Sequence, residues 1–263
     1  MAQRDLMFGD GAAYERLMGR WSQRVGTRFV DWLAPRPGLH WLDVGAGNGA
    51  FTEVLATRAA PARMTGIDPS EAQIAYARQR PSLAGSTFHI GDAQALPYDD
   101  AAFDASTMAL AISFVPEPVR AAAEMVRVTK PGGSVSTYMW DLPGGGLPLA
   151  PLFRALNAIG KSGTMPPSAE VSRREALHDL WHSAGLAEVE TDVIDIDVEF
   201  GDFDDFWTSV TLGVGPQARS VADLTKDEQQ RLQTHLRSSL PTAADGTIRY
   251  TATANAVKGR RPG

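Results

Sequence analysis

Hydrophobic and polar positions follow two periods along the chain, and these periods predict an ordered series of helices and strands. Apolar residues recur at helical spacing in some segments, whereas short apolar runs bounded by Gly, Pro or Asp mark strands. The predicted helices cover residues 11–34, 50–59, 70–80, 117–128, 149–159, 173–184 and 226–240, and another begins at residue 202. The predicted strands cover residues 39–44, 63–68, 86–90, 103–110, 133–140, 186–197 and 247–257.

This order of elements predicts an α/β fold. Strands and helices alternate up to residue 140, as they do in parallel sheets whose crossover helices cover both faces. We expect a Rossmann-like sheet of seven strands, parallel except for an antiparallel last strand after the turn at Asp245-Gly246. Residues 1–263 are expected to form a single domain.

Two segments of the second half interrupt the alternation. After Trp140 the chain becomes rich in Pro and Gly, and residues 141–170 are predicted to form a hinge, a short apolar helix and a loop. Residues 202–240 follow the sixth predicted strand and place acids in the first turn of a helix. We expect both segments to form a small helical cap over the carboxyl edge of the sheet.

The densest cluster of glycines follows the first predicted strand. Residues 39–52 combine a short apolar run, the acid Asp43, glycines at alternate positions from Gly45 to Gly49, and the start of a helix. Glycine lets a backbone turn sharply and approach a ligand closely, because it has no Cβ. Open α/β sheets bind their ligands at the carboxyl ends of their strands. This loop is therefore the predicted ligand site.

A glycine loop of this kind suits two cofactor classes. Enzymes that bind NAD use the spacing Gly-x-Gly-x-x-Gly around a pyrophosphate, whereas this loop has Gly-x-Gly-x-Gly. The carboxylate of Asp43 would repel a pyrophosphate, but it suits a cofactor that carries an ammonium and a sulfonium group. The spacing favours S-adenosylmethionine and leaves a dinucleotide open as the alternative.

Four segments together resemble the class I S-adenosylmethionine-dependent methyltransferases of the small-molecule type (methyltransferase type 11, UbiE-like). They are the glycine loop with Asp43, Asp68-Pro69 after the second predicted strand, Gly91-Asp92-Ala93-Gln94-Ala95-Leu96-Pro97, and Lys130-Pro131-Gly132-Gly133. The fourth segment is expected to be a helix–turn–strand connection without chemistry. The resemblance covers residues 12–140 by motif. It implies methyl transfer from S-adenosylmethionine to a small organic acceptor, with S-adenosylhomocysteine as the product.

The resemblance also implies which residues bind the cofactor. In the family, the acid at Asp68 binds the ribose hydroxyls, Asp92 and Ala93 meet the adenine edge, and Tyr14 and Arg20 close over the ligand. The expected cofactor residues are Tyr14, Arg20, Asp43, Gly45, Ala46, Gly47, Asn48, Asp68, Pro69, Asp92, Ala93, Met108 and Ala109.

Several of these residues have a purely structural alternative. Tyr14 suits a half-buried core ring, and Arg20 suits a solvated surface charge. Asp68 suits the N-cap of the following helix, although Ser70 fits that position as well. Asp92 suits a cap of its own turn. Both interpretations stay open for each residue.

The acceptor site is expected beyond the fourth and fifth predicted strands and under the cap. Its candidate residues are Ser113, Phe114, Trp140, Phe153 and Trp207, which offer aromatic surface and one hydroxyl group. A histidine pair is frequent in relatives where this chain has Ser113-Phe114, so that candidate base is missing. Asp141 is the best-placed carboxylate for a general base, with orientation of the hinge as its alternative role.

Composition narrows the partners. The chain has 263 residues, a formal net charge of −6 and no cysteine. The acidic balance argues against nucleic acid and anionic membranes as partners, and we expect a cytoplasmic monomer or homodimer. Without cysteine there is no thiolate nucleophile and no thiolate metal ligand. His178 and His182 have metal-ligand spacing but no third ligand nearby, so no metal site is expected.

These observations predict an enzyme that transfers a methyl group by in-line displacement. Such an enzyme chiefly holds the acceptor atom in line with the S–CH₃ bond and excludes water. Two alternatives stay open. One is a module that binds S-adenosylmethionine without turnover. The other is an NAD-dependent oxidoreductase, which would need a hydride-handling pair such as Tyr-x-x-x-Lys that the strand ends lack.

Overall fold

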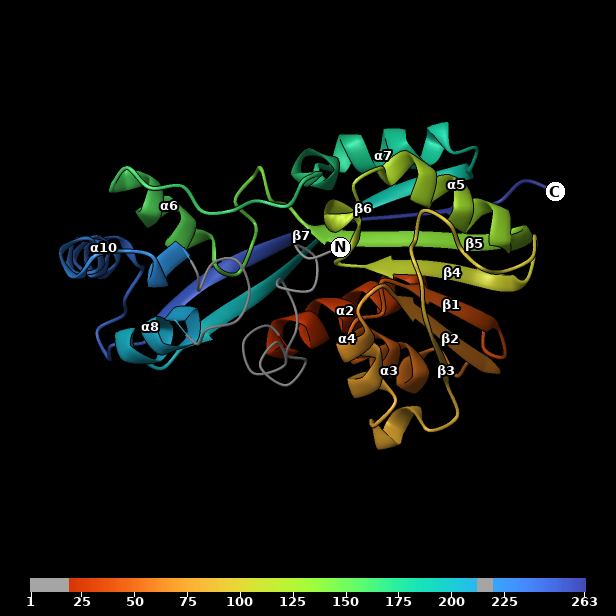
Figure 1. Cartoon of the computed structure of the whole chain (residues 1–263), viewed down its shortest axis with the longest axis horizontal. Helices are drawn as coiled ribbons and strands as arrows, with labels where there is room; N and C mark the ends of the chain where they lie inside the picture. The colour runs from red at the N-terminus through yellow and green to blue at the C-terminus, as the bar shows by residue number, and fades with distance from the viewer. Residues whose placement is uncertain (1–18, 212–219) are drawn as a thin grey trace.

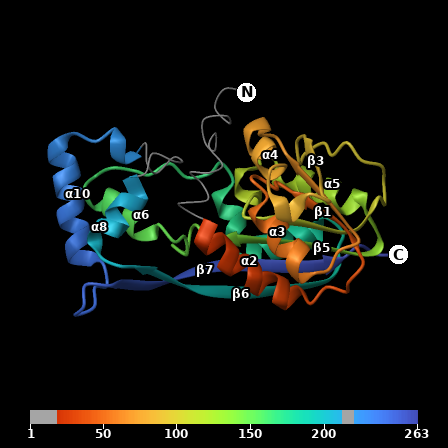
Figure 2. The same ribbon diagram turned by 90° about the horizontal axis from the view of Figure 1, so that it is seen from below.

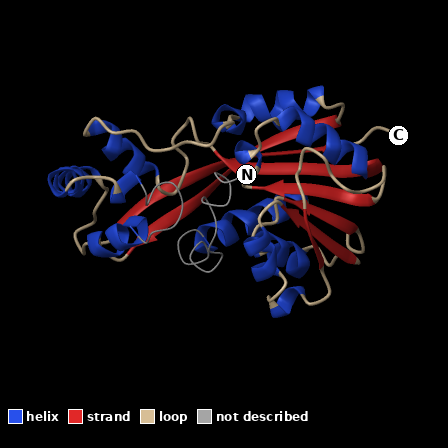
Figure 3. Ribbon diagram, in the orientation of Figure 1, coloured by secondary structure: helices blue, strands red, loops and turns tan. Residues whose placement is uncertain are grey.

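The computed structural model describes residues 19–211 and 220–263, and its centre is one sheet of seven strands in the order β3-β2-β1-β4-β5-β7-β6 (Figures 1 and 3). The strands pair in parallel except for β7, which is antiparallel to both β5 and β6. This topology confirms the predicted Rossmann-like sheet. The strands are β1 (His40–Val44), β2 (Arg63–Asp68), β3 (Thr87–Ile90), β4 (Phe103–Ala109), β5 (Thr129–Trp140), β6 (Ala187–Phe200) and β7 (Ile248–Arg260).

Helices cover both faces of the sheet (Figures 1 and 3). One face carries α2 (Arg20–Leu33), α3 (Ala50–Arg58) and α4 (Glu71–Ala77), and the other carries α5 (Pro118–Val128) and α7 (Arg174–Ser183). Because β1 and β4 lie between these two layers, they are buried on both faces and read as continuous apolar runs. The glycine loop emerges from this rigid centre.

The last two strands extend beyond the carboxyl ends of the others, and three helices gather around that extension (Figures 1 and 2). They are α6 (Ala150–Ala158), α8 (Phe203–Thr211) and α10 (Lys226–Ser239). In β6 the apolar residues from Ile194 to Phe200 are buried, and the acids between them are exposed. This alternation gives β6 one dry and one wet face, as the sequence predicted.

The capping box predicted before α10 is present. The Thr225 hydroxyl accepts from the N–H of Glu228, while the Glu228 carboxylate accepts from the N–H of Thr225. The two expected cap segments contain the helices α6, α8 and α10. Residues 212–219 of the second segment lie outside the described residues.

Helix α2 protects the free edge of the sheet. Strand β6 is an edge strand, so one side of its backbone has no neighbouring strand. The guanidinium groups of Arg24 and Arg28, both on α2, donate to the carbonyl oxygens of Asp197 and Asp195 on β6. These bonds satisfy edge acceptors and tie the first described helix to the strand that carries the cap.

Two local expectations were wrong. Residues 130–133, expected as a turn, belong to β5, which begins at Thr129 with an irregular register against β4. The positive φ of Gly132 (+74°) accommodates this irregularity, and the Gly132 N–H donates to the carbonyl of Arg261. The last strand also continues to Arg260, past the expected end at residue 257, because β5 is long enough to pair with it.

Gly66 provides a test of the packing around the site. A Cβ at Gly66 would lie 2.6 Å from ring carbons of Phe88 and 3.1 Å from the Cβ of Ala46 in the glycine loop. We expect Gly66→Ala to lower the free energy of unfolding by about 1–3 kcal/mol, measured by urea denaturation, because β2 is overpacked. The control is Gly85→Ala, where a Cβ has no neighbour within 4 Å. Equal stability of the two variants would contradict this account.

Candidate functional site

The glycine loop joins β1 to α3 and is fastened to the end of the neighbouring strand β2. The N–H groups of Gly45 and Ala46 both donate to the carbonyl oxygen of Ile67, at 2.8 and 3.0 Å. The Asn48 side-chain oxygen accepts from the N–H of Ala50, the first residue of α3, at 3.1 Å. These bonds satisfy backbone donors that a buried turn would otherwise leave without partners. The loop is therefore held in shape by the protein itself.

Two glycines of the loop have different surroundings. A Cβ at Gly45 (φ +73°) would lie 2.6 Å from the Cβ of Ala111, so this glycine permits close packing of the segment after β4. Leu110 turns that segment toward the loop with a φ of +55°. A Cβ at Gly47 (φ +52°) would meet only the side-chain oxygen of Gln73, at 4.0 Å. Among the described residues, Gly47 thus borders open space in which a ligand can approach the backbone.

Asp68, at the end of β2, holds the loop from the side. Its Oδ2 accepts from the N–H of Gly47 and its Oδ1 from the N–H of Ser70, each at 2.9 Å. Burial raises the pKa of Asp68, and the two N–H groups oppose this shift. Ser70 caps α4 by accepting from the N–H of Gln73, so Asp68 is not needed as the cap. Each carboxylate oxygen keeps acceptor capacity for a ligand hydroxyl.

Asp43, at the carboxyl end of β1, lies completely buried beneath the loop. Its Oδ2 accepts from the hydroxyl of Thr52 at 2.6 Å, and its Oδ1 has no hydrogen-bond partner among the described residues. Desolvation raises the pKa of Asp43 to about 7, the Thr52 hydroxyl opposes that rise, and the charge of Asp68 adds to it. An unpartnered buried carboxyl oxygen suits a ligand that brings a positive charge.

Asp92 caps the turn after β3. Its carboxylate accepts from both the backbone N–H and the side-chain amide of Gln94, each at 3.0 Å. The Gln94 side-chain oxygen in turn accepts from the N–H of Glu117. The turn-capping alternative is thus realised, and the expected contact of Asp92 and the half-buried Ala93 with adenine stays a prediction.

The segment after β4 is tied to the second half of the chain. The side chain of Met108 lies in the core, so a ligand can meet only its backbone, whereas Ala109 is half-buried. Ser113 is completely buried, its hydroxyl has no described partner, and its carbonyl accepts from the N–H of Ser168. The Ser168 hydroxyl donates to the carbonyl of Val115 at 2.8 Å.

The expected acceptor residues fall into two groups. Ser113, the half-buried Phe114 and the buried Trp140 lie at or after the ends of the neighbouring strands β4 and β5. Phe153 and Trp207 lie on α6 and α8, in the extension of the sheet. The Phe153 ring lies where a side chain at residue 163 would stand, and the Trp207 ring stacks on Phe203 with ring centres 6.3 Å apart.

Asp141 follows β5 and shapes the hinge after it. Its Oδ1 accepts from the N–H of Gly144 at 3.0 Å, and its backbone N–H donates to the carbonyl of Thr253 at 2.9 Å. These contacts fit the alternative role of Asp141, which is to orient the hinge. They engage Oδ1 of the carboxylate in the turn.

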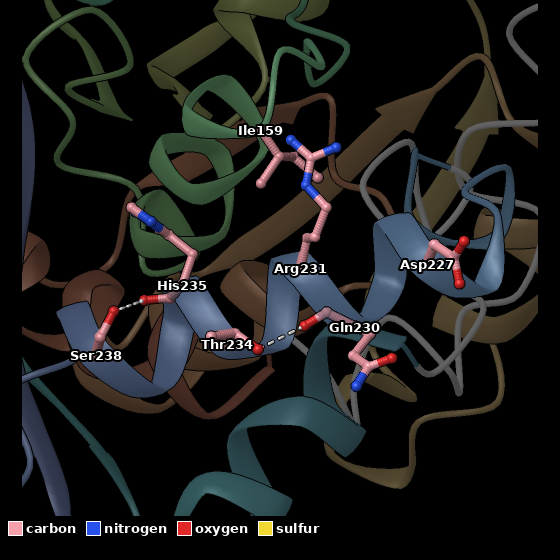
Figure 4. Close-up of a pocket in the computed structure, with 7 residues that line it drawn as sticks. All are labelled: Ile159, Asp227, Gln230, Arg231, Thr234, His235 and Ser238. Atoms are coloured by element: carbon pink, nitrogen blue, oxygen red, sulfur yellow. Dashed lines mark hydrogen bonds between the residues drawn. The ribbon is translucent and has the colours of Figure 1, made fainter.

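A surface pocket lies between α6 and α10 (Figure 4), among the helices of the extension and not at the glycine loop. Its lining residues are Ile159, Asp227, Gln230, Arg231, Thr234, His235 and Ser238. This pocket was not predicted from the sequence, because it arises where two helices from distant segments meet. Its walls combine polar and apolar surface and are open to solvent, so it does not resemble a closed catalytic cavity.

The remaining predictions concern Tyr14 and Arg20, a metal site and a membrane-spanning helix. Tyr14 lies outside the described residues, and Arg20 is described only as the first residue of α2. The rings of His178 and His182 stack 5.9 Å apart on α7, and no group of three metal-ligating side chains occurs in residues 19–211 and 220–263. Over the same residues, no helix is both long and apolar enough to cross a membrane.

Thr52 was missed by the sequence analysis. Its signal was present, because Thr52 lies in the first turn of the helix that follows the glycine loop. A hydroxyl in that turn can reach back to an acid at the end of the preceding strand only if the loop between them is tight. The contact therefore depends on the loop conformation, which the sequence did not specify in detail.

Comparisons with known proteins agree with this geometry. A family model described as a methyltransferase domain matches residues 42–137. A demethylmenaquinone methyltransferase of Renibacterium salmoninarum is 36% identical over 186 residues, which cover 69% of this chain and 75% of the relative. A ubiquinone/menaquinone biosynthesis C-methyltransferase UbiE of Paracoccus denitrificans is 39% identical over 111 residues, 41% of this chain and 44% of that relative. The chain thus spans about half the length of the UbiE relatives.

A solved structure shares the fold. It belongs to a protein from Bacillus halodurans, described in its title as a methyltransferase of inferred function. The TM-score is 0.59 at 17% sequence identity, and the match covers 90% of this chain and 99% of the other. At this identity the likeness concerns the fold alone.

Asp43 makes the stability of the ligand-free protein depend on pH. Its pKa in the folded state, about 7, is above the ordinary value of an aspartate carboxyl group, 3.8. The raised pKa therefore stabilises the folded protein fully at a pH below 3.8, and this stabilisation is lost as the pH rises through about 7. In Asp43→Asn this loss is absent. Between pH 5 and pH 8, the unfolding free energy of the wild type should fall by roughly 2–3 kcal/mol more than that of the variant. Urea denaturation at both pH values measures this difference, and parallel pH profiles would contradict the assignment.

Proposed function

This chain belongs to the class I S-adenosylmethionine-dependent methyltransferases, and on that basis we propose that its acceptor is a small electron-rich aromatic ring of the quinol class, methylated on carbon. The chain is an enzyme that transfers a methyl group from S-adenosylmethionine to a small-molecule acceptor, with S-adenosylhomocysteine as the product. The proposal concerns the acceptor and the residues that hold both ligands.

The observation that carries the proposed acceptor is the match to a relative named for demethylmenaquinone, over three quarters of that relative. The chemistry of the expected acceptor residues supports it. Phe114, Trp140, Phe153 and Trp207 are aromatic and suit a flat apolar ring. Asp141, the one carboxylate among the candidates, has its Oδ1 engaged by the hinge. Methylation of a quinol ring carbon breaks the S–CH₃ bond, forms a C–C bond and releases the proton of that carbon. This proton is acidic once the methyl group is attached and can leave to a weak acceptor such as a hydroxyl group or water, so no strong enzymatic base is needed and the two observations agree.

We assign the cofactor to the carboxyl ends of β1, β2 and β3. The backbone of Gly45, Ala46, Gly47 and Asn48 would line the methionine part, because Gly47 borders open space. The free acceptor capacity of Asp68, followed by Pro69, would take the ribose hydroxyls.

The remaining contacts of the cofactor follow from the same edge of the sheet. Asp92 and Ala93 would meet the adenine edge, and the backbone of Met108 and Ala109 would lie beneath the ligand. Tyr14 and Arg20 complete the assignment from the N-terminal side. Asp43 would face the cationic end of the cofactor with its unpartnered oxygen.

The bound cofactor supplies a methyl carbon already activated by its sulfonium charge. The task left to this chain is to hold the acceptor in line and to exclude water, which can lower a barrier by roughly 7–11 kcal/mol. We propose that the 1–263 chain acts as one methyltransferase domain in which α6, α8 and α10 form the cap that excludes water. The ties between Ser168 and the segment after β4 link that cap to the sheet.

The acceptor is tested by incubating the protein with S-adenosylmethionine and reduced 1,4-naphthoquinone. We expect a product heavier by one methylene unit whose new methyl group is bonded to a ring carbon, seen by mass spectrometry and NMR. Methylation of the hydroxyl oxygen would overturn the quinol proposal. Tight S-adenosylhomocysteine binding without turnover of any acceptor in a panel of phenols, amines and quinols would instead favour a binding module.

Asp68 offers a test of the cofactor site. Asp68→Ala removes the acceptor of two backbone N–H groups and the proposed ribose contact, so we expect S-adenosylhomocysteine affinity to fall about 10- to 100-fold in calorimetric titration. Asp99→Ala is the control, because it removes the same charge from an exposed residue. Unchanged affinity in Asp68→Ala, or binding of NAD in place of S-adenosylhomocysteine, would refute the assignment.

Asp141 offers a test of the base-free mechanism. Asp141→Asn keeps an oxygen that can accept from Gly144 but loses the ability to take a proton. We expect kcat with the quinol acceptor to stay within about threefold of the wild type, whereas loss of a general base typically lowers it by about 10²- to 10⁴-fold. Steady-state kinetics across pH 6–8 separates the two outcomes.

A further inference from the structure

The side-chain amide of Gln94 joins the turn after β3 to the start of a helix. Gln94 lies in that turn, two residues beyond Asp92, and it is half-buried. Its Nε2 donates to both oxygens of the Asp92 carboxylate, each at 3.0 Å, and its Oε1 accepts from the N–H of Glu117 at 3.0 Å. Glu117 is the N-cap of α5. One amide group therefore connects the Asp92 carboxylate to a rigid element.

The chemistry of these partners leaves the amide a single orientation. A carboxylate can only accept hydrogen bonds, and a backbone N–H can only donate one. The Gln94 amide must therefore turn its NH₂ group to Asp92 and its oxygen to Glu117. The backbone N–H of Gln94 also donates to Asp92 Oδ1, at 3.0 Å. Because both carboxylate oxygens accept from Gln94, the rotation of the Asp92 carboxylate is restricted.

Helix α5 also holds the residues that follow Gln94. The Glu124 Oε2 accepts from the N–H of Leu96 at 2.7 Å, and the Arg127 guanidinium donates to the carbonyl oxygen of Leu96 at 3.0 Å. Glu124 and Arg127 are themselves paired at 2.7 Å. The segment from Asp92 to Leu96 is therefore held against α5, and Gln94 transmits this fixed position to the carboxylate.

We propose that Gln94 is a positioning residue that sets the purine specificity of the cofactor site: it holds the Asp92 carboxylate where this group accepts from the 6-amino group of adenine. This inference rests on the proposed contact of Asp92 and Ala93 with the adenine edge. Both residues are half-buried, so a ligand can reach them from solvent. A purine without the amino group gives the carboxylate no donor, and an acceptor that loses its partner on binding is costly.

A positioning role and a purely structural role predict different results. If Gln94 only stabilised the turn, its removal would weaken every ligand of the turn equally. If Gln94 aims the carboxylate, its removal weakens only a ligand that carries the amino group. The ratio of two affinities therefore separates the two roles.

The experiment compares S-adenosylhomocysteine with its analogue that has unsubstituted purine in place of adenine, by calorimetric titration. The analogue keeps the ring nitrogens and lacks only the 6-amino group. We expect the wild type to bind the analogue about 10- to 100-fold more weakly, because a hydrogen bond to a charged group is lost. In Gln94→Met, which keeps a side chain of similar length without the amide, this ratio should fall at least about threefold, while the affinity for the analogue changes less than about twofold.

Two further variants support the comparison. Gln79→Met makes the same substitution at an exposed glutamine after α4, and it should leave both affinities unchanged. Gln94→Glu keeps an oxygen that can accept from the Glu117 N–H, but its side chain has no donor for Asp92 and brings a second negative charge. We expect it to lower the ratio at least as much as Gln94→Met, so the test does not depend on one variant that folds.

The outcomes separate this inference from the assignment beneath it. A ratio in Gln94→Met and Gln94→Glu equal to that of the wild type, or larger, would overturn the role of Gln94. Asp92→Ala tests the adenine contact by itself: undiminished discrimination in that variant, or equal binding of both ligands by the wild type, would refute the contact and the inference with it. A wild-type protein that binds neither ligand would refute the cofactor assignment.

Discussion

The structure depends on the hydrogen bonds that fasten the glycine loop to the end of β2. Ile67 supplies one carbonyl that accepts from both Gly45 and Ala46, and Asp68 supplies a carboxylate oxygen for Gly47. A tight turn cannot satisfy these donors within itself, so the neighbouring strand must do it. The parallel register of β1 and β2 brings those acceptors to the right place. The same contacts that fold the loop therefore also shape the ligand site.

This arrangement concentrates negative charge where the cofactor is proposed to bind. Asp43 and Asp68 are both raised in pKa by burial, and the charge of Asp68 adds to the shift of Asp43. In the free protein, the glycine loop and the sheet hold both acids in position although their like charges are unfavourable. The proposed cationic cofactor would relieve this repulsion. Ligand binding and stability are therefore coupled through the same two carboxyl groups.

The sequence predicted the parts of the molecule that depend on local patterns. The strands, the capping box at Thr225 and the glycine loop follow from hydrophobic period and residue type, and the structure confirms them. The bulge at Gly132 and the arginine contacts to the edge of β6 were missed, because they join residues far apart in the chain. The Thr52 contact was missed for a related reason: it depends on the conformation of the loop. The residues that bind the cofactor stay predictions.

The two ligands are assigned to parts of the chain with different origins in the fold. The family model ends at residue 137, within β5, so it contains every described residue assigned to the cofactor except α2. Of the proposed acceptor residues, Ser113 and Phe114 lie within the same range, whereas the helices α6, α8 and α10 follow later and stand on the extension of β6 and β7 (Figure 2). That extension is joined to the cofactor half by the continuous strands β6 and β7, by the bonds of Arg24 and Arg28 to β6, and by Ser168 at the segment after β4. The glycine loop is fastened to β2 and not to the cap, so changes in α6, α8 or α10 would reach the proposed acceptor site without removing the hydrogen bonds that hold the loop.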